Sequence, residues 1–195
     1  MPTSSAPQPE AAFRGSVLRA YLETMRGDGV LDRVLPHVDA EVRGLVDMPP
    51  TSSELVPARI TNALIEGYCS ELGEDATRGM ARRANRVGIV RIIEPIIRTA
   101  MRLGGGGPAA ILSRLDLILK QQQRGYDLGW DALGENAGRV RLVSYGLRET
   151  GPSLISWEGA LSIAFDLTST TGTVRAESRR FDGAASHSAL AVRWS

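Results

Sequence analysis

The spacing of apolar residues changes about two thirds of the way along the chain, and this change most limits the available folds. Before it, apolar residues recur every three or four positions, which predicts amphipathic helices over Glu10–Met25, Glu54–Leu72 and Asp75–Leu103. After it, buried-type and exposed-type positions alternate along Arg139–Ser144, as in a half-buried strand. Helices followed by strands predict an α+β fold, with an N-terminal helical layer packed on a short C-terminal antiparallel sheet.

Cap and breaker residues divide the helical part. Asp39 is the expected N-cap of a helix over Ala40–Val46. Gly73 is expected to end the helix that starts at Glu54, and Pro95 to kink the long helix that follows. Further helices are predicted over Val30–Leu35, Ala109–Gln123 and Ser153–Leu167.

The end of the chain has the pattern of a hairpin. Thr171–Phe181 and Ser188–Trp194 are predicted to pair as strands, with Asp182 and Gly183 at the turn. His187 is then a solvent-near residue at the start of the last strand.

Composition and length predict a single α+β domain over residues 10–195, after a disordered, proline-containing leader over residues 1–9. The formal net charge of +1 gives no overall field to gather nucleic acid, so no nucleic-acid partner is expected. Charged residues interrupt the longest apolar stretch, Val87–Leu103, which excludes it as a membrane span. A single cysteine, Cys69, forms no intramolecular disulfide, and we expect a cytoplasmic location.

The usual catalytic and metal-binding patterns do not occur in the sequence. The two histidines, His37 and His187, are far apart, and no Cys-x-x-Cys or His-x-x-x-His accompanies them, so no metal site is predicted. Gly104–Pro108 follows a predicted helix and lacks the lysine of a phosphate-binding loop, which favours a hinge or loop. We therefore expect a protein that is not an enzyme.

Arginines at positions 78, 82, 83 and 86 share one predicted helix face. A solvated stripe is the simpler interpretation, and a site for an acidic partner or phosphate is the alternative. Cys69 lies late in the preceding helix, where core packing is the simpler interpretation and a modified thiol the alternative.

The segment from residue 89 to 97 carries more apolar groups than one helix face needs, which leaves mid-core, a hydrophobic pocket or a subunit interface. The candidate pocket or interface residues come from this segment and from one face of the helix predicted over Ser153–Leu167; they are Ile89, Ile92, Ile93, Ile96, Leu161 and Phe165.

The order of four motifs resembles a known family. They are FRGSVLRAYLE at residues 13–23, LDRVLPHVDAEVRGLVDMPP at 31–50, ISWEGALSIAFDL at 155–167, and a last strand ending in RW. This order resembles the uncharacterised paralogue family expanded in myxobacteria. That family is similar to the vinyl-4-reductase small-molecule-binding domain, the haem-NO-binding domain and the TRAPP vesicle-tethering subunits. The resemblance implies an α+β fold whose relatives bind ligands between the long helix and the sheet.

This sequence lacks several residues that carry the chemistry of these relatives. Where relatives carry cysteines in the final hairpin, this chain has Ser178, Ser186 and Ser188. Haem-NO-binding relatives use a helical histidine and a Tyr-x-Ser-x-Arg motif, and neither occurs here, since Tyr145–Glu149 reads YGLRE. No haem or other cofactor is therefore expected. TRAPP relatives carry an acylated cysteine in the helical region that corresponds to Cys69.

These observations together predict a non-enzymatic, cytoplasmic regulatory or sensory module that binds a small apolar ligand. The alternative is a homodimeric protein-interaction or scaffolding module without a ligand, in which the same isoleucines join two copies.

Overall fold

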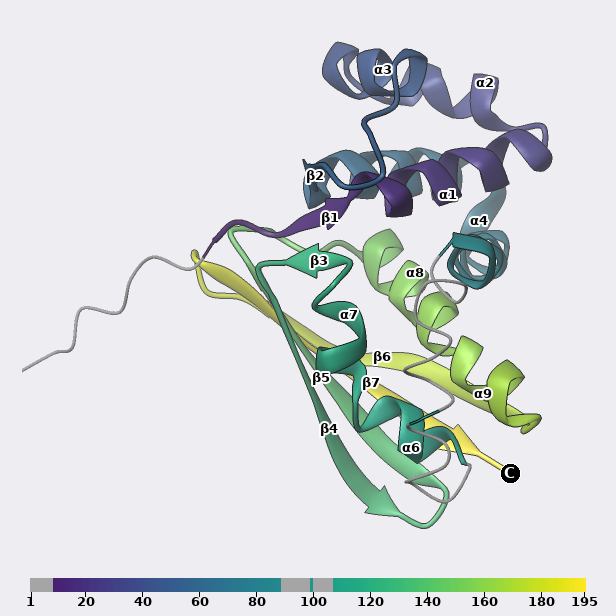
Figure 1. Ribbon diagram of the computed structural model, residues 1–195, viewed down its shortest axis with the longest axis vertical. Coiled ribbons are helices and arrows are strands. Elements are labelled where there is room, and N and C mark those ends of the chain that lie inside the picture. The colour runs from purple at the N-terminus through teal and green to yellow at the C-terminus, as the bar shows by residue number, and fades with distance from the viewer. Residues whose placement is uncertain (1–8, 89–98, 100–106) are drawn as a thin grey trace, which may run out of the picture.

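Four antiparallel strands form the main sheet of the computed structural model, which describes residues 9–88, 99 and 107–195 (Figure 1). In spatial order they are β4 (Tyr126–Gly134), β5 (Ala137–Tyr145), β7 (Ala185–Trp194) and β6 (Gly172–Phe181). Val140 pairs with Leu190, and both are fully buried on the inner face. The sheet and the helices that cover this face confirm the predicted α+β fold.

The predicted C-terminal hairpin is present as β6 and β7. Gly183 at the turn has a φ of 97°, which glycine adopts without strain. The Asp182 carboxylate accepts hydrogen bonds from the backbone N–H groups of Ala184 (3.0 Å) and Ala185 (2.9 Å). His187 lies in β7, where its Nε2 is 2.8 Å from Asp182 Oδ2.

Strand β4 was missed by the sequence analysis, although it has the same period of two. Tyr126 and Leu128 are buried, whereas Asp127 between them is exposed. Glycines and aspartates, which are poor strand formers, weaken the signal.

A second, small sheet changes the starts of two predicted helices. β1 (Ala12–Arg14) pairs with both β2 (Leu55–Pro57) and β3 (Gln123–Arg124). Helix α1 therefore begins only at Gly15 and runs over Gly15–Gly27, and helix α4 begins at Ala58 and runs over Ala58–Gly88. The predicted starts at Glu10 and Glu54 were wrong because these residues enter or flank the sheet.

The other helices of the N-terminal layer follow the prediction more closely. They are α2 (Leu31–Val34), the 3₁₀ helix η1 (Leu35–His37), which continues through Pro36, and α3 (Ala40–Asp47). Asp39 caps α3 as predicted, because its side chain accepts from the backbone N–H of Val42 at 2.9 Å. Gly73, with a φ of 82°, interrupts α4 at the predicted break.

Two predicted helices are each divided. The segment predicted as one helix over Ala109–Gln123 forms α6 (Pro108–Leu112) and α7 (Leu115–Leu119), because Arg114 leaves the helical region. Ser153–Leu167 forms α8 (Gly151–Leu161) and α9 (Ile163–Thr168). In Figure 1, α6 and α7 lie in front of the β4 side of the sheet, and α8 and α9 in front of the β6 side.

Helix α8 packs between α4 and the sheet, and Gly159 allows its close approach to α4. A Cβ atom at Gly159 would lie 2.1 Å from the backbone oxygen of Arg78. Among the described residues, no helix is both long and apolar enough to cross a membrane. The predicted kink at Pro95 lies outside the described residues.

Candidate functional site

A cavity lies among the helices α1, α4, α6, α7, α8 and α9. The volume of this cavity is about 90 Å³. Most of its wall is apolar, and the aliphatic part includes Val17, Ile65, Ile111, Leu115, Ile118 and Leu161.

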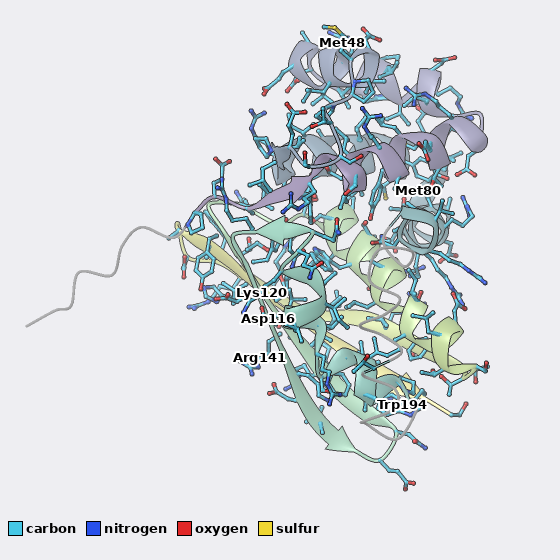
Figure 2. The ribbon with its side chains drawn as sticks, in the orientation of Figure 1. Met48, Met80, Asp116, Lys120, Arg141 and Trp194 are labelled. Atoms are coloured by element: carbon cyan, nitrogen blue, oxygen red, sulfur yellow. The ribbon has the colours of Figure 1, made fainter. Side chains whose placement is uncertain are left out.

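Helix α7 has an apolar side that faces the cavity and a charged side that faces the solvent. Leu115, Ile118 and Leu119 line the cavity. On its solvent side, Lys120 Nζ is 2.6 Å from the Asp116 carboxylate, and Figure 2 shows this pair next to each other at the surface. The amphipathic pattern of a five-residue helix thus separates cavity from water.

Aromatic rings form one end of the wall. Phe13 on β1 and Trp157 on α8 both line the cavity, with ring centroids 6.5 Å apart. Tyr126 stacks behind Phe13 at 5.2 Å. Burial, followed by the nearby charge of Glu149, raises the pKa of Tyr126 well above its usual value, so its phenol is neutral.

A hydrogen-bonded polar cluster lies at another part of the wall. Tyr21 Oη is 2.8 Å from Ser156 Oγ and accepts from Asn85 Nδ2 at 3.2 Å. All three residues line the cavity. Burial raises the pKa of Tyr21, which keeps this cluster uncharged.

The buried carboxylate of Glu149, 2% exposed, connects the cavity wall to the sheet. It accepts from two wall residues, Asn62 Nδ2 on α4 (3.4 Å) and Ser153 Oγ on α8 (2.5 Å). On the sheet side it accepts from Ser144 Oγ of β5 at 2.7 Å, and the Glu149 backbone N–H donates to Ser186 Oγ of β7 at 2.8 Å. A change in the wall therefore has a direct hydrogen-bonded route to the central strands.

Thr61 is the exception among the polar wall residues. It lies on α4 in the cavity wall and is 1% exposed, yet its Oγ1 has no hydrogen-bond partner within the described part of the chain. A buried hydroxyl without a hydrogen-bond partner lowers the stability of the folded protein, so Thr61 Oγ1 is an unsatisfied hydrogen-bonding group in the cavity wall.

The predicted site residues fall in different places. Leu161 lines the cavity. Phe165 is buried outside the cavity wall, against Gly172 at the start of β6, where a Cβ atom would lie 2.6 Å from its ring. Cys69 is half-buried on α4 and outside the cavity wall. Ile89, Ile92, Ile93 and Ile96 lie outside the described residues.

The polar wall residues were missed by the sequence analysis. Their signal is a set of small polar residues on the apolar faces of helices, such as Thr61 and Asn62 between Ile60 and Leu64. Such residues are also common in ordinary cores, so the pattern alone does not predict a site.

The arginine stripe on α4 was predicted as solvated, and Arg82 and Arg83 are exposed as expected, whereas Arg78 is half-buried; all three form ion pairs. Arg78 Nε donates to the buried carboxylate of Glu158 at 2.8 Å. Arg82 forms an ion pair with Asp166 on α9, and Arg83 with Asp28 at 2.6 Å. These guanidinium groups hold helices together and are already neutralised by carboxylates.

The residues around the cavity do not fit haem, the cofactor that the resemblance to haem-NO-binding domains would imply. His37 is 2.9 Å from Glu71 and His187 is 2.8 Å from Asp182, both at the surface and outside the cavity wall. Tyr21 in the wall already has two hydrogen-bond partners. A volume of about 90 Å³ is also far too small for a porphyrin. In the described part of the chain, no cluster of three or more His, Cys, Asp or Glu side chains is placed to hold a metal ion.

Comparisons with known proteins identify the fold. No protein-family model and no curated protein sequence matches this chain. Among solved structures, a Cs H-NOX mutant with an unnatural 4-cyano-L-phenylalanine is similar with a TM-score of 0.66 and 13% identity, covering 93% of this chain and 96% of that chain. A mutant T. tengcongensis H-NOX gives 0.62 and 13%, with 93% and 97% covered. An oxygen-binding H-NOX domain related to soluble guanylate cyclases, in its oxygen complex, gives 0.60 and 13%, with 93% and 94% covered. The chain therefore has an H-NOX-like α+β fold.

Proposed function

We propose that this chain is a non-enzymatic sensory or regulatory module that binds a small, mostly apolar ligand in the cavity among α1, α4, α7 and α8. The observation that carries the proposal is the cavity itself, because closely packed proteins rarely leave apolar volume unfilled without a use. The oxygen complex of an H-NOX domain supports binding of small molecules by proteins of this fold.

The hydrogen bonds around Glu149 support the sensory part of the proposal. Asn62 and Ser153 contact both the cavity and the carboxylate, and Ser144 and Ser186 join the same residue to the middle of the sheet. A ligand that changes the positions of α4 and α8 would thereby change the hydrogen bonding of β5 and β7. Such a differential contact is what a ligand needs to shift a conformational equilibrium.

The proposal also includes the predictions about domain extent, location and family relationship. We infer a single domain over residues 10–195, a cytoplasmic location, and relationship to the myxobacterial paralogue family and to the vinyl-4-reductase and TRAPP folds. The homodimer alternative depends on Ile89, Ile92, Ile93 and Ile96, which lie outside the described residues.

An NMR titration with an apolar probe tests the proposal. The indole N–H signal of Trp157, assigned by its loss in Trp157→Phe, should move when 2-methylbutane is added, because this ring lines the cavity. Leu161→Phe fills the cavity and should abolish the shift. Leu117→Phe is the matched control, since Leu117 is 60% exposed on α7, and it should retain the shift. An unmoved Trp157 signal in the wild type would refute ligand binding at this site.

A further inference from the structure

The described part of the cavity wall carries polar side chains but no charged one. Among the described residues, no Asp, Glu, Lys, Arg or His lines it, and its polar members are hydroxyl and amide side chains. An ion against this described part of the wall would lose its hydration without gaining from it a partner of opposite charge, which is strongly unfavourable. The nearest carboxylate, that of Glu149, is hydrogen-bonded to wall residues Asn62 and Ser153 and would in addition repel an anion.

Within this neutral wall, the Thr61 hydroxyl is unsatisfied. Threonine in a helix usually donates to the carbonyl four residues earlier. Thr77 does so to Gly73 O at 2.9 Å on the same helix, and Thr168 to Ala164 O at 2.8 Å on α9. Thr61 is as deeply buried as Thr77 and borders the cavity, but among the described residues its Oγ1 has no hydrogen-bond partner.

The size of the cavity limits the ligand. An engineered protein cavity of about 150 Å³ accommodates benzene, which has six non-hydrogen atoms. The present volume of about 90 Å³ is smaller and corresponds to a ligand of roughly five non-hydrogen atoms.

We propose that the ligand is a small neutral molecule, mainly apolar, with one hydrogen-bonding oxygen that pairs with Thr61 Oγ1, as in a short-chain alcohol. This inference rests on the proposed function, because it specifies the chemistry of the same cavity. Its apolar part contacts the aliphatic wall around Leu161, and its oxygen pairs with the hydroxyl of Thr61, which is unpaired among the described wall residues.

Four probes of similar shape separate the contributions of polarity and charge. They are 2-butanol, 2-methylbutane with a methyl in place of the hydroxyl, sec-butylammonium, and propionate, each with five non-hydrogen atoms. Dissociation constants follow from the Trp157 indole signal, in the wild type and in Thr61→Val, which replaces the hydroxyl by a methyl group. We expect 2-butanol to bind the wild type about tenfold more tightly than 2-methylbutane, as one added hydrogen bond allows, and the two ions not to bind. In Thr61→Val this preference should disappear.

Each outcome distinguishes the two proposals. If 2-methylbutane binds the wild type as tightly as 2-butanol, or if Thr61→Val keeps the preference, the hydroxyl-bearing ligand is refuted while the cavity remains a binding site. Binding of propionate or sec-butylammonium at comparable affinity would also overturn the neutral-ligand inference. If none of the four probes moves the Trp157 signal, the proposed function itself fails.

Discussion

Replacing Thr61 by valine should stabilise the protein, which is unusual for a substitution at a buried position. The Thr61 side chain is 1% exposed and its hydroxyl has no hydrogen-bond partner. Burying an unpaired hydroxyl costs about 1–3 kcal/mol, and valine puts a methyl group in the same place. Both side chains are β-branched, so the entropy lost in the helix is nearly unchanged. We expect the free energy of unfolding to rise by about 1 kcal/mol.

Thr77→Val on the same helix is the matched control. Thr77 is fully buried, but its hydroxyl donates to Gly73 O at 2.9 Å. Its replacement removes a hydrogen bond and should lower the free energy of unfolding by about 1 kcal/mol. Urea unfolding monitored by circular dichroism measures both changes, and the melting temperatures should shift by roughly 2–4 °C in opposite directions. If Thr61→Val destabilises as Thr77→Val does, the Thr61 hydroxyl has a partner in the folded protein and the reasoning is refuted.

Three further changes test the packing and electrostatics around the site. Glu149→Leu leaves Asn62, Ser144 and Ser153, which donate to this carboxylate, without an acceptor. It should lower the free energy of unfolding, measured by urea titration, by about 3 kcal/mol or more. A neutral effect would contradict the role of Glu149 in connecting the cavity wall to the sheet. Gly159→Ala should destabilise the protein by about 1–3 kcal/mol, because its Cβ would overlap a backbone oxygen of α4. Gly44→Ala in α3 is the control, because open space surrounds Gly44, and it should stabilise the protein by about 0.5–1 kcal/mol. Equal shifts in melting temperature would contradict the close contact between α8 and α4. Two backbone N–H groups, with His187, hold the pKa of Asp182 well below its usual range, so its contribution is present above the unfolded pKa of about 3.9 and is lost as the pH falls through the folded pKa. The stability difference between wild type and Asp182→Ala should therefore be constant near neutral pH and shrink only under strongly acidic conditions, and a difference that vanishes at pH 6 would show that the charge of Asp182 is not responsible.

The fold was predictable from sequence where a pattern extends over a whole element. The alternation in β5 and β7 is long enough to show a period of two, and the Asp182–Gly183 turn separates the last two strands. Strands β1 and β2 have only three residues each, too few to show any period, and they form because distant segments meet. The starts of α1 and α4 were misplaced for this reason.

The candidate site was less predictable, because its residues come from segments far apart in the chain. Leu161 was chosen from an apolar helix face and lies in the cavity wall, whereas Phe165 on the same predicted face lies in the core, because Ser162 divides the helix between them. The roles of Thr61 and Glu149 depend on which hydrogen bonds form in three dimensions. Sequence shows that a polar residue is present but not whether its partner is.

A crystal structure of the protein equilibrated with xenon under pressure tests most directly whether the cavity is a binding site. Xenon enters apolar cavities of this size range and is located by its anomalous scattering. We expect one strong peak bordered by Ile65, Ile111 and Leu161. The absence of a peak there, with the surrounding side chains filling the cavity, would contradict the proposal that this cavity binds a small ligand.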